Sequence, residues 1–367
     1  HSALQKAAKG DTVWVARGIY RPDTATDRRR SFVLPSGVVM LGGFRGTETT
    51  VAQRDVARNI ATLSGDIGQH EDSTDNTYTI LYMENPDSTT VLDGFTLEHG
   101  NADYKGTDAP FRAREKCGGA LYIMARDGWA YPEIRRCTFQ YNSAYVHGGA
   151  VFVNGTGLGS VAPRFTHCVF RYNQARVNGG GLYKDGASWT ERASDVAHCQ
   201  FLSNTAGYNG GGFYFTDAER TDHPQIEYCT FTGNRAVALA GGGFSMDLGR
   251  KDGSGGARVF GCTFVHNVSK RAESYYVDNT YGLPIHTFEV DSCVFKGRDT
   301  ASILFISGNV YQAVCKVDRC FFEMSGTLSF TDADTMIINR CTFVNSPYLS
   351  LFKLGIVTSL YTIFKNS

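Results

Sequence analysis

The sequence predicts an all-β protein, folded as a parallel β-solenoid of roughly ten coils with a short helix as its N-terminal cap. Three observations support this prediction: a recurring Cys-x-Phe motif, a glycine pair ahead of each of the first five copies, and short β-type runs broken by Gly, Asn and Asp. One repeat cannot bury its own apolar face, whereas stacked repeats share a continuous core. The 367 residues therefore predict one repeat architecture.

The predicted cap is an amphipathic helix over residues 1–9. Leu4 and Ala7 lie on one side of it, Lys6 and Lys9 lie on the other, and Gly10 ends it. A chain that opens inside structure is typical of a processed fragment, so we expect the protein to be a piece of a longer one.

The main repeat is apolar-x-x-Cys-x-Phe, and it recurs at intervals of 21 to 33 residues. Because side chains alternate across a strand, the Cys and Phe of each copy point to the same face, which we expect to be the interior. In the first five copies an Asn follows the Phe and can hydrogen-bond along its column at a bend. The predicted ladder positions are Cys137, Cys168, Cys199, Cys229, Cys262, Cys293, Cys320 and Cys341, with Asn142, Asn173, Asn204, Asn234 and Asn267.

The glycine pairs mark bends of the chain, as at Gly118-Gly119 and Gly148-Gly149. Glycine is the residue that tolerates a positive φ or the close approach of a neighbouring backbone. We divide the single predicted domain, residues 1–367, into a cap with opening coils (1–100), regular repeats (101–267) and irregular C-terminal coils (268–367).

The ten cysteines allow two interpretations. Eight of them share one repeat position, which predicts a buried and reduced column rather than disulfides. Disulfides remain the alternative, and Cys117 and Cys315 are the two cysteines outside the column that could pair. Spacing typical of a zinc site is absent.

Charge and hydropathy exclude two classes of partner. The 36 Lys and Arg residues balance the 36 Asp and Glu residues, so nothing predicts attraction to nucleic acid. The chain contains no run of roughly 18 apolar residues, so we expect no membrane span.

The glycine-pair strand followed by Phe-x-x-Asn resembles the repeat of the polymorphic outer-membrane protein family. The stretches 10–20 and 92–97 also resemble secreted bacterial surface proteins of the right-handed parallel β-helix repeat type, with choice-of-anchor members. The resemblance implies a right-handed coil and a secreted or bacterial cell-surface location. It also implies further domains of the same polypeptide, or an outer-membrane assembly, as partners. Pectate-lyase-like enzymes share this fold, but no lyase signature transfers residue by residue.

The loops that leave one corner of successive repeats are the predicted ligand-binding wall. Exposed Trp beside carboxylates and Arg suits a sugar, because the indole offers an apolar face and guanidinium binds acid groups and hydroxyls. The alternative is that these loops only cover the flank of the coil. The candidate ligand-binding residues are Trp129, Tyr131, Trp189, Glu191, Arg192, Asp217, Glu219, Arg220, Asp222 and His223, continued by Arg250 and Lys251.

Two insertions, 101–116 and 268–287, are longer than ordinary connections and are second candidates for function, or else flaps over the coil. Asn154, Asp185 and Asp247 occupy equivalent positions and raise calcium as an alternative. However, the two Asp lie two coils apart, about 10 Å, which is too far to share one ion. We expect no metal site and no cofactor.

The sequence thus predicts a non-catalytic extracellular or cell-surface module for adhesion or glycan binding, whose partner is a glycan or a cell-surface protein. The alternative is a polysaccharide lyase or glycoside hydrolase acting on an acidic polysaccharide, and a structural spacer is a third possibility. No residue is assigned a catalytic role, because the nine His are scattered and no catalytic motif appears.

Overall fold

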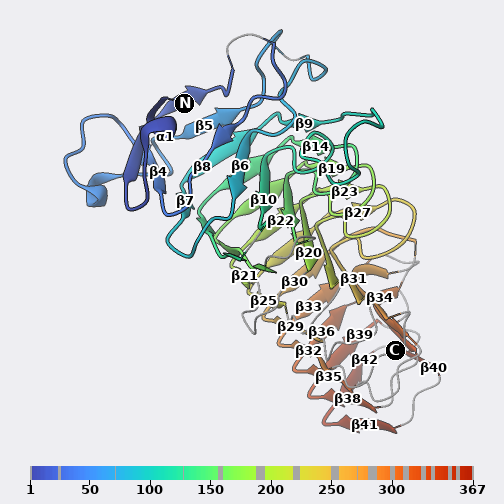
Figure 1. Ribbon diagram of the computed structural model, residues 1–367. Coiled ribbons are helices and arrows are strands. Elements are labelled where there is room, and N and C mark those ends of the chain that lie inside the picture. The colour runs from blue at the N-terminus through green and yellow to red at the C-terminus, as the bar shows by residue number, and fades with distance from the viewer. Residues whose placement is uncertain are drawn as a thin grey trace. The chain divides into compact units, whose positions relative to one another are not determined.

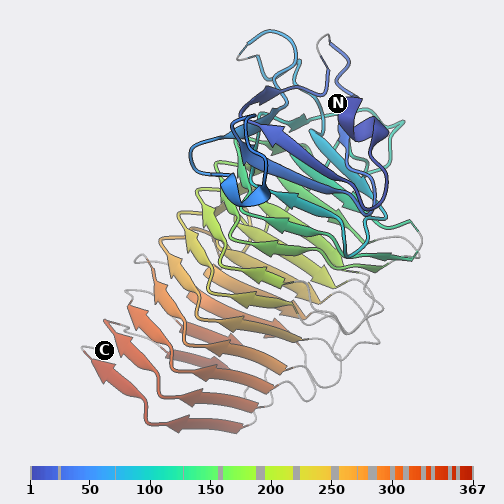
Figure 2. The same ribbon diagram turned by 90° about the vertical axis from the view of Figure 1, so that its left-hand side faces the viewer.

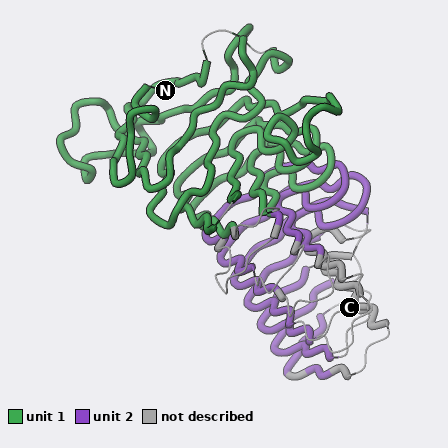
Figure 3. Tube along the Cα trace, in the orientation of Figure 1, with its two compact units in different colours: residues 1–184 green, residues 185–367 purple. Residues whose placement is uncertain are grey.

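A computed structural model describes residues 2–23, 26–70, 72–126, 128–155, 160–186, 195–217, 224–248, 256–270, 272–279, 287–297, 302–308, 314–323, 328–331, 335–345, 349–352 and 356–365. The chain divides into two compact units, residues 1–184 (unit 1) and 185–367 (unit 2), which are coloured separately in Figure 3.

The helical content is small. Helix α1 (Ser2–Lys6) buries Leu4 against β3 and is shorter than the helix expected over 1–9. A short 3-10 helix, η1 (Val51–Gln53), begins a segment that covers part of unit 1. Among the described residues, no helix is long and apolar enough to cross a membrane.

Unit 1 is built from parallel sheets whose neighbouring strands come from successive repeats. Sheet A contains β1 (Thr12–Ala16), β4 (Val39–Phe44), β7 (Val91–Asp93), β12 (Glu133–Arg135) and β17 (Arg164–Thr166). Sheet B contains β2 (Gly18–Tyr20), β5 (Ala61–Ser64), β8 (Phe95–Glu98), β13 (Thr138–Gln140) and β18 (Val169–Arg171). Sheet C contains β3 (Phe32–Val33), β6 (Leu81–Glu84), β10 (Leu121–Met124), β15 (Val151–Asn154) and β20 (Leu182–Gly186). Smaller sheets contain β9 (Asn101–Ala102), β14 (Ser143–Ala144) and β19 (Gln174–Ala175), and β11 (Trp129–Ala130) with β16 (Ser160–Val161).

Unit 2 repeats the same plan, and its strands are named by the same sheet letters. Sheet A contains β21 (Asp195–Ala197), β25 (Gln225–Glu227), β29 (Gly256–Phe260), β32 (Thr287–Asp291), β35 (Val314–Asp318), β38 (Thr335–Asn339) and β41 (Ile356–Leu360). Sheet B contains β22 (Gln200–Leu202), β26 (Thr230–Thr232), β30 (Thr263–Val265), β33 (Val294–Lys296), β36 (Phe321–Glu323), β39 (Thr342–Val344) and β42 (Ile363–Lys365). Sheet C contains β24 (Phe213–Asp217), β28 (Phe244–Leu248), β31 (Ala272–Asn279), β34 (Ser302–Gly308), β37 (Leu328–Thr331) and β40 (Leu349–Phe352), and a short sheet pairs β23 (Thr205–Ala206) with β27 (Arg235–Ala236).

The predicted all-β class with parallel sheets is confirmed. Within each repeat the chain passes through sheet A, sheet B and sheet C in that order, and in the repeats from β9 to β27 a strand of the short sheet lies between those of sheets B and C (Figure 1). The arrows of neighbouring strands point the same way in Figure 2, as parallel stacking of repeats requires. This arrangement is consistent with a parallel β-helix. In the described residues, sheet B has five rungs in unit 1 and seven in unit 2, against the roughly ten coils expected.

A phenylalanine column fills the interior of both units. Phe139 and Phe170 stack with ring centroids 4.9 Å apart in unit 1. The column in unit 2 begins with Phe201 and Phe231 at 4.7 Å and ends with Phe343 and Phe364 at 4.9 Å. These separations match the spacing between neighbouring strands, so each ring lies on its counterpart in the next repeat.

A buried asparagine ladder lies at the bend after sheet B. In unit 1 both the backbone N–H and the Nδ2 of Asn142 donate to Oδ1 of Asn173, at 3.0 and 3.1 Å. In unit 2 the Nδ2 of Asn204 donates to Asn234, and that of Asn234 to Asn267, at 2.9 and 3.0 Å. Each buried amide is therefore satisfied by its neighbour in the stack.

All ten cysteines are buried, and none of them forms a disulfide. The ladder thiols hydrogen-bond to backbone carbonyls of the preceding repeat, as Cys229 does to Val196 at 3.3 Å. Cys117 and Cys315 do not pair with each other.

The glycine pairs provide both a positive φ and room for the close approach of neighbouring backbones, as the sequence predicts. Gly118 has a φ of +67°, and a Cβ on Gly119 would lie 2.5 Å from the carbonyl oxygen of Ser143. The first glycine provides the turn, and the second lets three backbones pack together.

Candidate functional site

The structure describes only part of the predicted ligand-binding wall. Trp129 begins β11, is 51% exposed, and stacks on Tyr131 with ring centroids 5.9 Å apart. Asp217 ends β24, and its side chain is outside the described residues. The remaining wall residues also lie outside them: Trp189, Glu191, Arg192, Glu219, Arg220, Asp222, His223, Arg250 and Lys251.

A pocket of about 580 Å³ lies in unit 1, on the outer face of sheet C beneath the insertion 101–116. Its residues come from three strands, from the turn after β10, and from the insertion. They are Tyr82, Glu84, Pro110, Arg112, Ala113, Arg114, Glu115, Tyr122, Met124, Arg126 and Asn154. We call this the Tyr82–Tyr122 pocket.

Two tyrosines form the floor of the pocket because strand alternation turns them outward. Tyr82 on β6 and Tyr122 on β10 occupy paired positions, between inward residues such as Leu81 and Leu121. Their ring centroids lie 6.0 Å apart, and Phe152 on β15 continues the row 5.3 Å from Tyr122. Tyr122 is only 3% exposed and Phe152 is fully buried, so Tyr82 is the ring of this row that stays partly accessible.

The insertion is fixed over this floor by hydrogen bonds to its backbone. The Tyr122 hydroxyl donates to the carbonyl of Arg112 at 2.7 Å, and Thr79 donates to the carbonyl of Arg114 at 2.7 Å. Within the insertion, Nζ of Lys116 donates to the carbonyl of Ala109 at 2.8 Å. Phe111 adds an edge-to-face contact with the buried His147, 5.5 Å between centroids. The insertion is thus a docked wall of the pocket.

The polar groups of the floor are mutually satisfied. The Tyr82 hydroxyl donates to Oε2 of Glu84 at 2.9 Å, and the other oxygen of Glu84 pairs with Arg126. The Nδ2 of Asn154 donates to the Tyr122 hydroxyl at 2.7 Å. Burial, and then the bond to Glu84, raises the pKa of Tyr82 to about 12, and burial raises the pKa of Tyr122. Both phenols therefore remain protonated near neutral pH.

The rim of the pocket is basic. Three guanidinium groups, those of Arg112, Arg114 and Arg126, face two carboxylates, Glu84 and Glu115. Glu84 is already neutralised by Arg126, while the Arg114 guanidinium lies 5.4 Å from the centre of the Tyr82 ring. An aromatic floor beside a basic rim favours a ligand that has both an apolar face and an acidic group.

Sequence reasoning identified the insertion but missed the floor. It singled out Arg112, Arg114 and Glu115 through the length of the segment that holds them. Tyr82 and Tyr122 are not among the residues that the sequence predicts for a site. The available signal was tyrosine at the outward phase of two successive sheet C strands.

The three residues that raise calcium as an alternative lie on strands of sheet C. Asn154 bonds to Tyr122, Asp185 is buried on β20, and Asp247 accepts a hydrogen bond from Tyr214 at 3.2 Å. In the part of the chain that the structure describes, no three His, Cys, Asp or Glu side chains gather as metal ligands do.

Fold and pocket together define a class: an all-β protein of parallel, repeat-built sheets with an aromatic-floored, arginine-rimmed pocket on an outer face. No protein family model, no curated protein and no solved structure matches the chain.

Proposed function

We propose that the protein is a non-catalytic module of the secreted or bacterial cell-surface kind, and that it binds an acidic glycan in the Tyr82–Tyr122 pocket. The observation that supports this most directly is the Arg114 guanidinium, which lies 5.4 Å from the centre of the outward Tyr82 ring in a pocket that Arg112 also lines. A sugar ring offers C–H groups to an aromatic surface, and its carboxylate or sulfate accepts from guanidinium. The half-exposed Trp129 also supports adhesion, because it too offers an aromatic face.

The resemblance to polymorphic outer-membrane protein repeats and to choice-of-anchor β-helix proteins supports the proposed location. Those families carry parallel β-helices at the cell surface, and this chain shares their glycine-pair and Phe-x-x-Asn pattern. A right-handed coil, further domains of the same polypeptide and an outer-membrane assembly belong to the same proposal.

The state of the pocket favours binding over catalysis. A lyase or hydrolase needs a group that takes or gives a proton near neutral pH. Tyr82, whose pKa is raised to about 12, stays protonated, and Glu84 is held by Arg126 and by the Tyr82 hydroxyl. The enzyme alternative would require a proton-transferring residue from another part of the chain.

A glycan array, followed by titration of the best acidic ligand, tests the proposal. Tyr82→Ala and Arg114→Gln should each weaken binding about tenfold, while Tyr172→Ala, which removes an exposed tyrosine at the bend after β18, should leave it unchanged. The proposal fails if the array is blank for acidic glycans or if all three variants bind alike. An assay for unsaturated products or new reducing ends tests the enzyme alternative. Turnover by the parent that is lost in Arg114→Gln would favour that alternative.

A further inference from the structure

Unit 1 carries a second hollow that shares no residue with the Tyr82–Tyr122 pocket. It is a groove of about 600 Å³ on the outer face of sheet B, closed on one side by the segment after η1. Its lining residues are Val56, Ala57, Ile60, Thr62, Gly94, Phe95, Thr96, Glu98, Arg136, Thr138, Gln140 and Arg171. We call it the sheet B groove.

The floor of the groove is a row of hydroxyls that faces an apolar wall. Thr62, Thr96 and Thr138 occupy paired positions on β5, β8 and β13, so their side chains follow one another from rung to rung. The opposite wall includes Ile60, which is 53% exposed although it is a large aliphatic residue. Hydroxyls on one side and an aliphatic face on the other match the two faces of a sugar ring.

One end of the groove is basic and fixed in place. Nε of Arg136 donates to Oδ1 of Asp93 at 2.9 Å and its Nη2 donates to Oδ2, so the buried carboxylate holds the guanidinium by two bonds. The Arg136 side chain is nevertheless 51% exposed and lines the groove. Asp93 is thus a positioning residue, and Arg136 presents its remaining N–H groups to a ligand.

Arg54 reinforces this end from behind. Its side chain is only 9% exposed, its Nη1 donates to Asp93 at 3.0 Å, and its Nε has no hydrogen-bond partner among the described residues. A Cβ on Gly94 would lie 2.7 Å from Nη2 of Arg54, so this glycine lets the guanidinium lie directly against the groove floor. A buried donor without a partner adds positive potential to the site.

The other end of the groove has a chain of polar side chains across three rungs. Nε of Arg171 donates to Oε1 of Gln140 at 2.8 Å, and Nε2 of Gln140 donates to Glu98 at 2.5 Å. Gln140 ends β13, whereas Arg136 lies at the corner before that strand, so the two polar ends of the groove lie at opposite ends of one short strand.

The charges at the groove do not balance. Arg136, Arg171 and Glu98 line the groove. Behind them, Arg54 and Arg135 bond to Asp93, and Arg135 also pairs with Glu133, so four guanidinium groups stand against three carboxylates. The pair between Arg58 and Asp55 on the covering segment, 3.7 Å apart, is neutral in itself. One positive charge therefore remains, next to hydroxyls and an aliphatic wall.

We infer that the sheet B groove is a second saccharide site, which binds one carboxylate- or sulfate-bearing sugar unit with its anionic group at Arg136. The inference goes beyond the proposed function, because it holds whether or not the Tyr82–Tyr122 pocket binds glycan. Arg136 binds the anion, the buried Arg54 adds positive potential behind it, the threonine row meets the hydroxyls, and Ile60 covers the C–H face.

Calorimetric titration of the full chain with D-glucuronate, D-glucose and inorganic sulfate tests this inference in an Arg114→Gln background, which weakens the other pocket. Glucuronate should bind, sulfate should compete with it, and glucose should bind at least tenfold more weakly. Arg171→Gln and Arg136→Gln should each lower glucuronate affinity about tenfold, the effect expected of one charge-assisted hydrogen bond. Arg176→Gln, an exposed arginine of unit 1 outside the groove, is the matched control.

The variants separate a binding effect from a folding effect. Arg136 touches the buried Asp93, so Arg136→Gln requires a check of thermal stability, whereas Arg171 is exposed and should be replaced without loss of fold. Loss of binding in Arg171→Gln at unchanged thermal midpoint supports the site. The inference is overturned if glucuronate binds both groove variants as it binds the control, or if glucose binds as well as glucuronate. Failure of the Tyr82–Tyr122 pocket would appear instead in Tyr82→Ala, which leaves the groove intact.

Discussion

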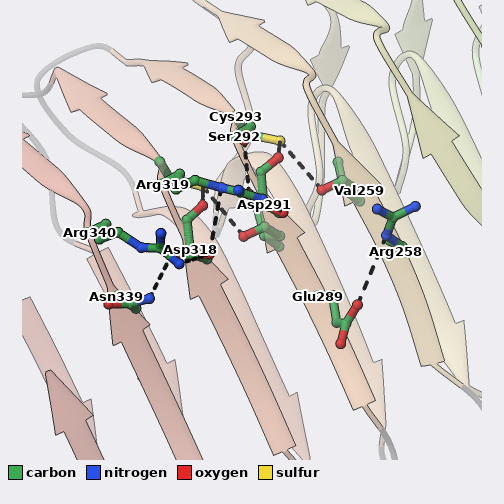
Figure 4. A network of polar contacts seen from close by, with 12 residues as sticks. Arg258, Val259, Glu289, Asp291, Ser292, Cys293, Asp318, Arg319, Asn339 and Arg340 are labelled. Atoms are coloured by element: carbon green, nitrogen blue, oxygen red, sulfur yellow. Dashed lines mark hydrogen bonds and ion pairs between the residues drawn. The ribbon is translucent and has the colours of Figure 1, made fainter. Parts of the chain in front are cut away.

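Both units have a pair of Asp and Arg at a corner between sheet A and sheet B. The two pairs differ mainly in how much of the chain covers them. In unit 1 the carboxylate at the end of β7, Asp93, binds Arg136, the left-handed corner residue of the next rung (φ +50°). In unit 2 the carboxylate at the end of β32, Asp291, binds Arg319, which has the same place and a φ of +52° (Figure 4). Asp318 and Arg340 repeat the arrangement one rung later, at 3.2 Å.

The difference lies in what surrounds the carboxylate. The Asp93 side chain is fully buried and takes bonds from Arg54 and Arg135 as well as from Arg136. The Asp291 side chain is 19% exposed, and its partner Arg319 is 48% exposed. A covering segment that contributes Arg54 has thus changed an ordinary surface pair into a buried cluster. Since water screens the exposed pair and not the buried one, the same chemistry should carry different energetic weight.

Removing the carboxylate should give the largest contrast. Asp93→Ala leaves the nearly buried Arg54 and its neighbours without a counter-charge, so we expect a loss of about 3–5 kcal/mol in the free energy of unfolding. Asp291→Ala, its matched variant, should cost only a small fraction of that. Urea unfolding of both variants measures the difference, and equal losses would show that the cover makes no contribution.

Removing the covering arginine should have an intermediate effect. Arg54→Gln leaves Asp93 with two guanidinium partners but abolishes a charge-assisted bond, and we expect a loss of about 1.5–3 kcal/mol. Arg58→Gln, on the same segment with its side chain 88% exposed, is the control and should unfold like the parent. A parent-like Arg54→Gln would mean that Arg135 and Arg136 suffice for Asp93.

The contrast should also depend on pH, with a predictable sign. Burial works to raise the pKa of Asp93, but the bonds from Arg136 and Arg54 outweigh it and hold that pKa below its usual range. A lowered native pKa stabilises the fold above the unfolded value of about 3.9, and this stabilisation is lost as the pH falls through the native value. The stability gap between the parent and Asp93→Asn should therefore be constant from pH 7 to 5 and shrink below about pH 4. Unfolding curves at several pH values test this, and a gap that grows on acidification would reverse the sign.

Salt should produce the smallest effect and only in unit 2. At 1 M NaCl the screening length is about 3 Å, which weakens an exposed pair and leaves a buried one almost unchanged. Any effect of Arg319→Gln on unfolding at low salt should disappear at 1 M NaCl, whereas the loss in Asp93→Ala should persist. If the loss of stability in Arg319→Gln also persists at 1 M NaCl, the Asp291–Arg319 pair behaves like a buried ion pair.

The sequence was informative wherever a position repeats. The phase of Cys137 and Phe139 predicts which side chains point inward, because alternation in a strand leaves two faces and the repeat shows which is apolar. The Asp93 cluster could not be predicted in this way, since Arg54 comes from a segment that has no counterpart in other repeats. The Tyr82–Tyr122 pocket could be predicted in part. The length of the insertion indicates its wall, but its floor depends on which outward residues the insertion covers. Trp129 is exposed on the flank as a ligand platform requires, while Trp189 lies outside the described residues.

The glycine pairs determine which changes of length the chain tolerates. A methyl group on Gly119 would meet three carbonyl oxygens from neighbouring rungs, between 2.5 and 2.9 Å away. Removing a full repeat leaves every column continuous, because Phe170 and Asn173 stand where Phe139 and Asn142 stood. Deleting some thirty residues in phase should therefore disturb this coil less than adding one carbon atom at Gly119. Homologues of this protein should therefore differ in length by whole repeats and should keep glycine at the position of Gly119.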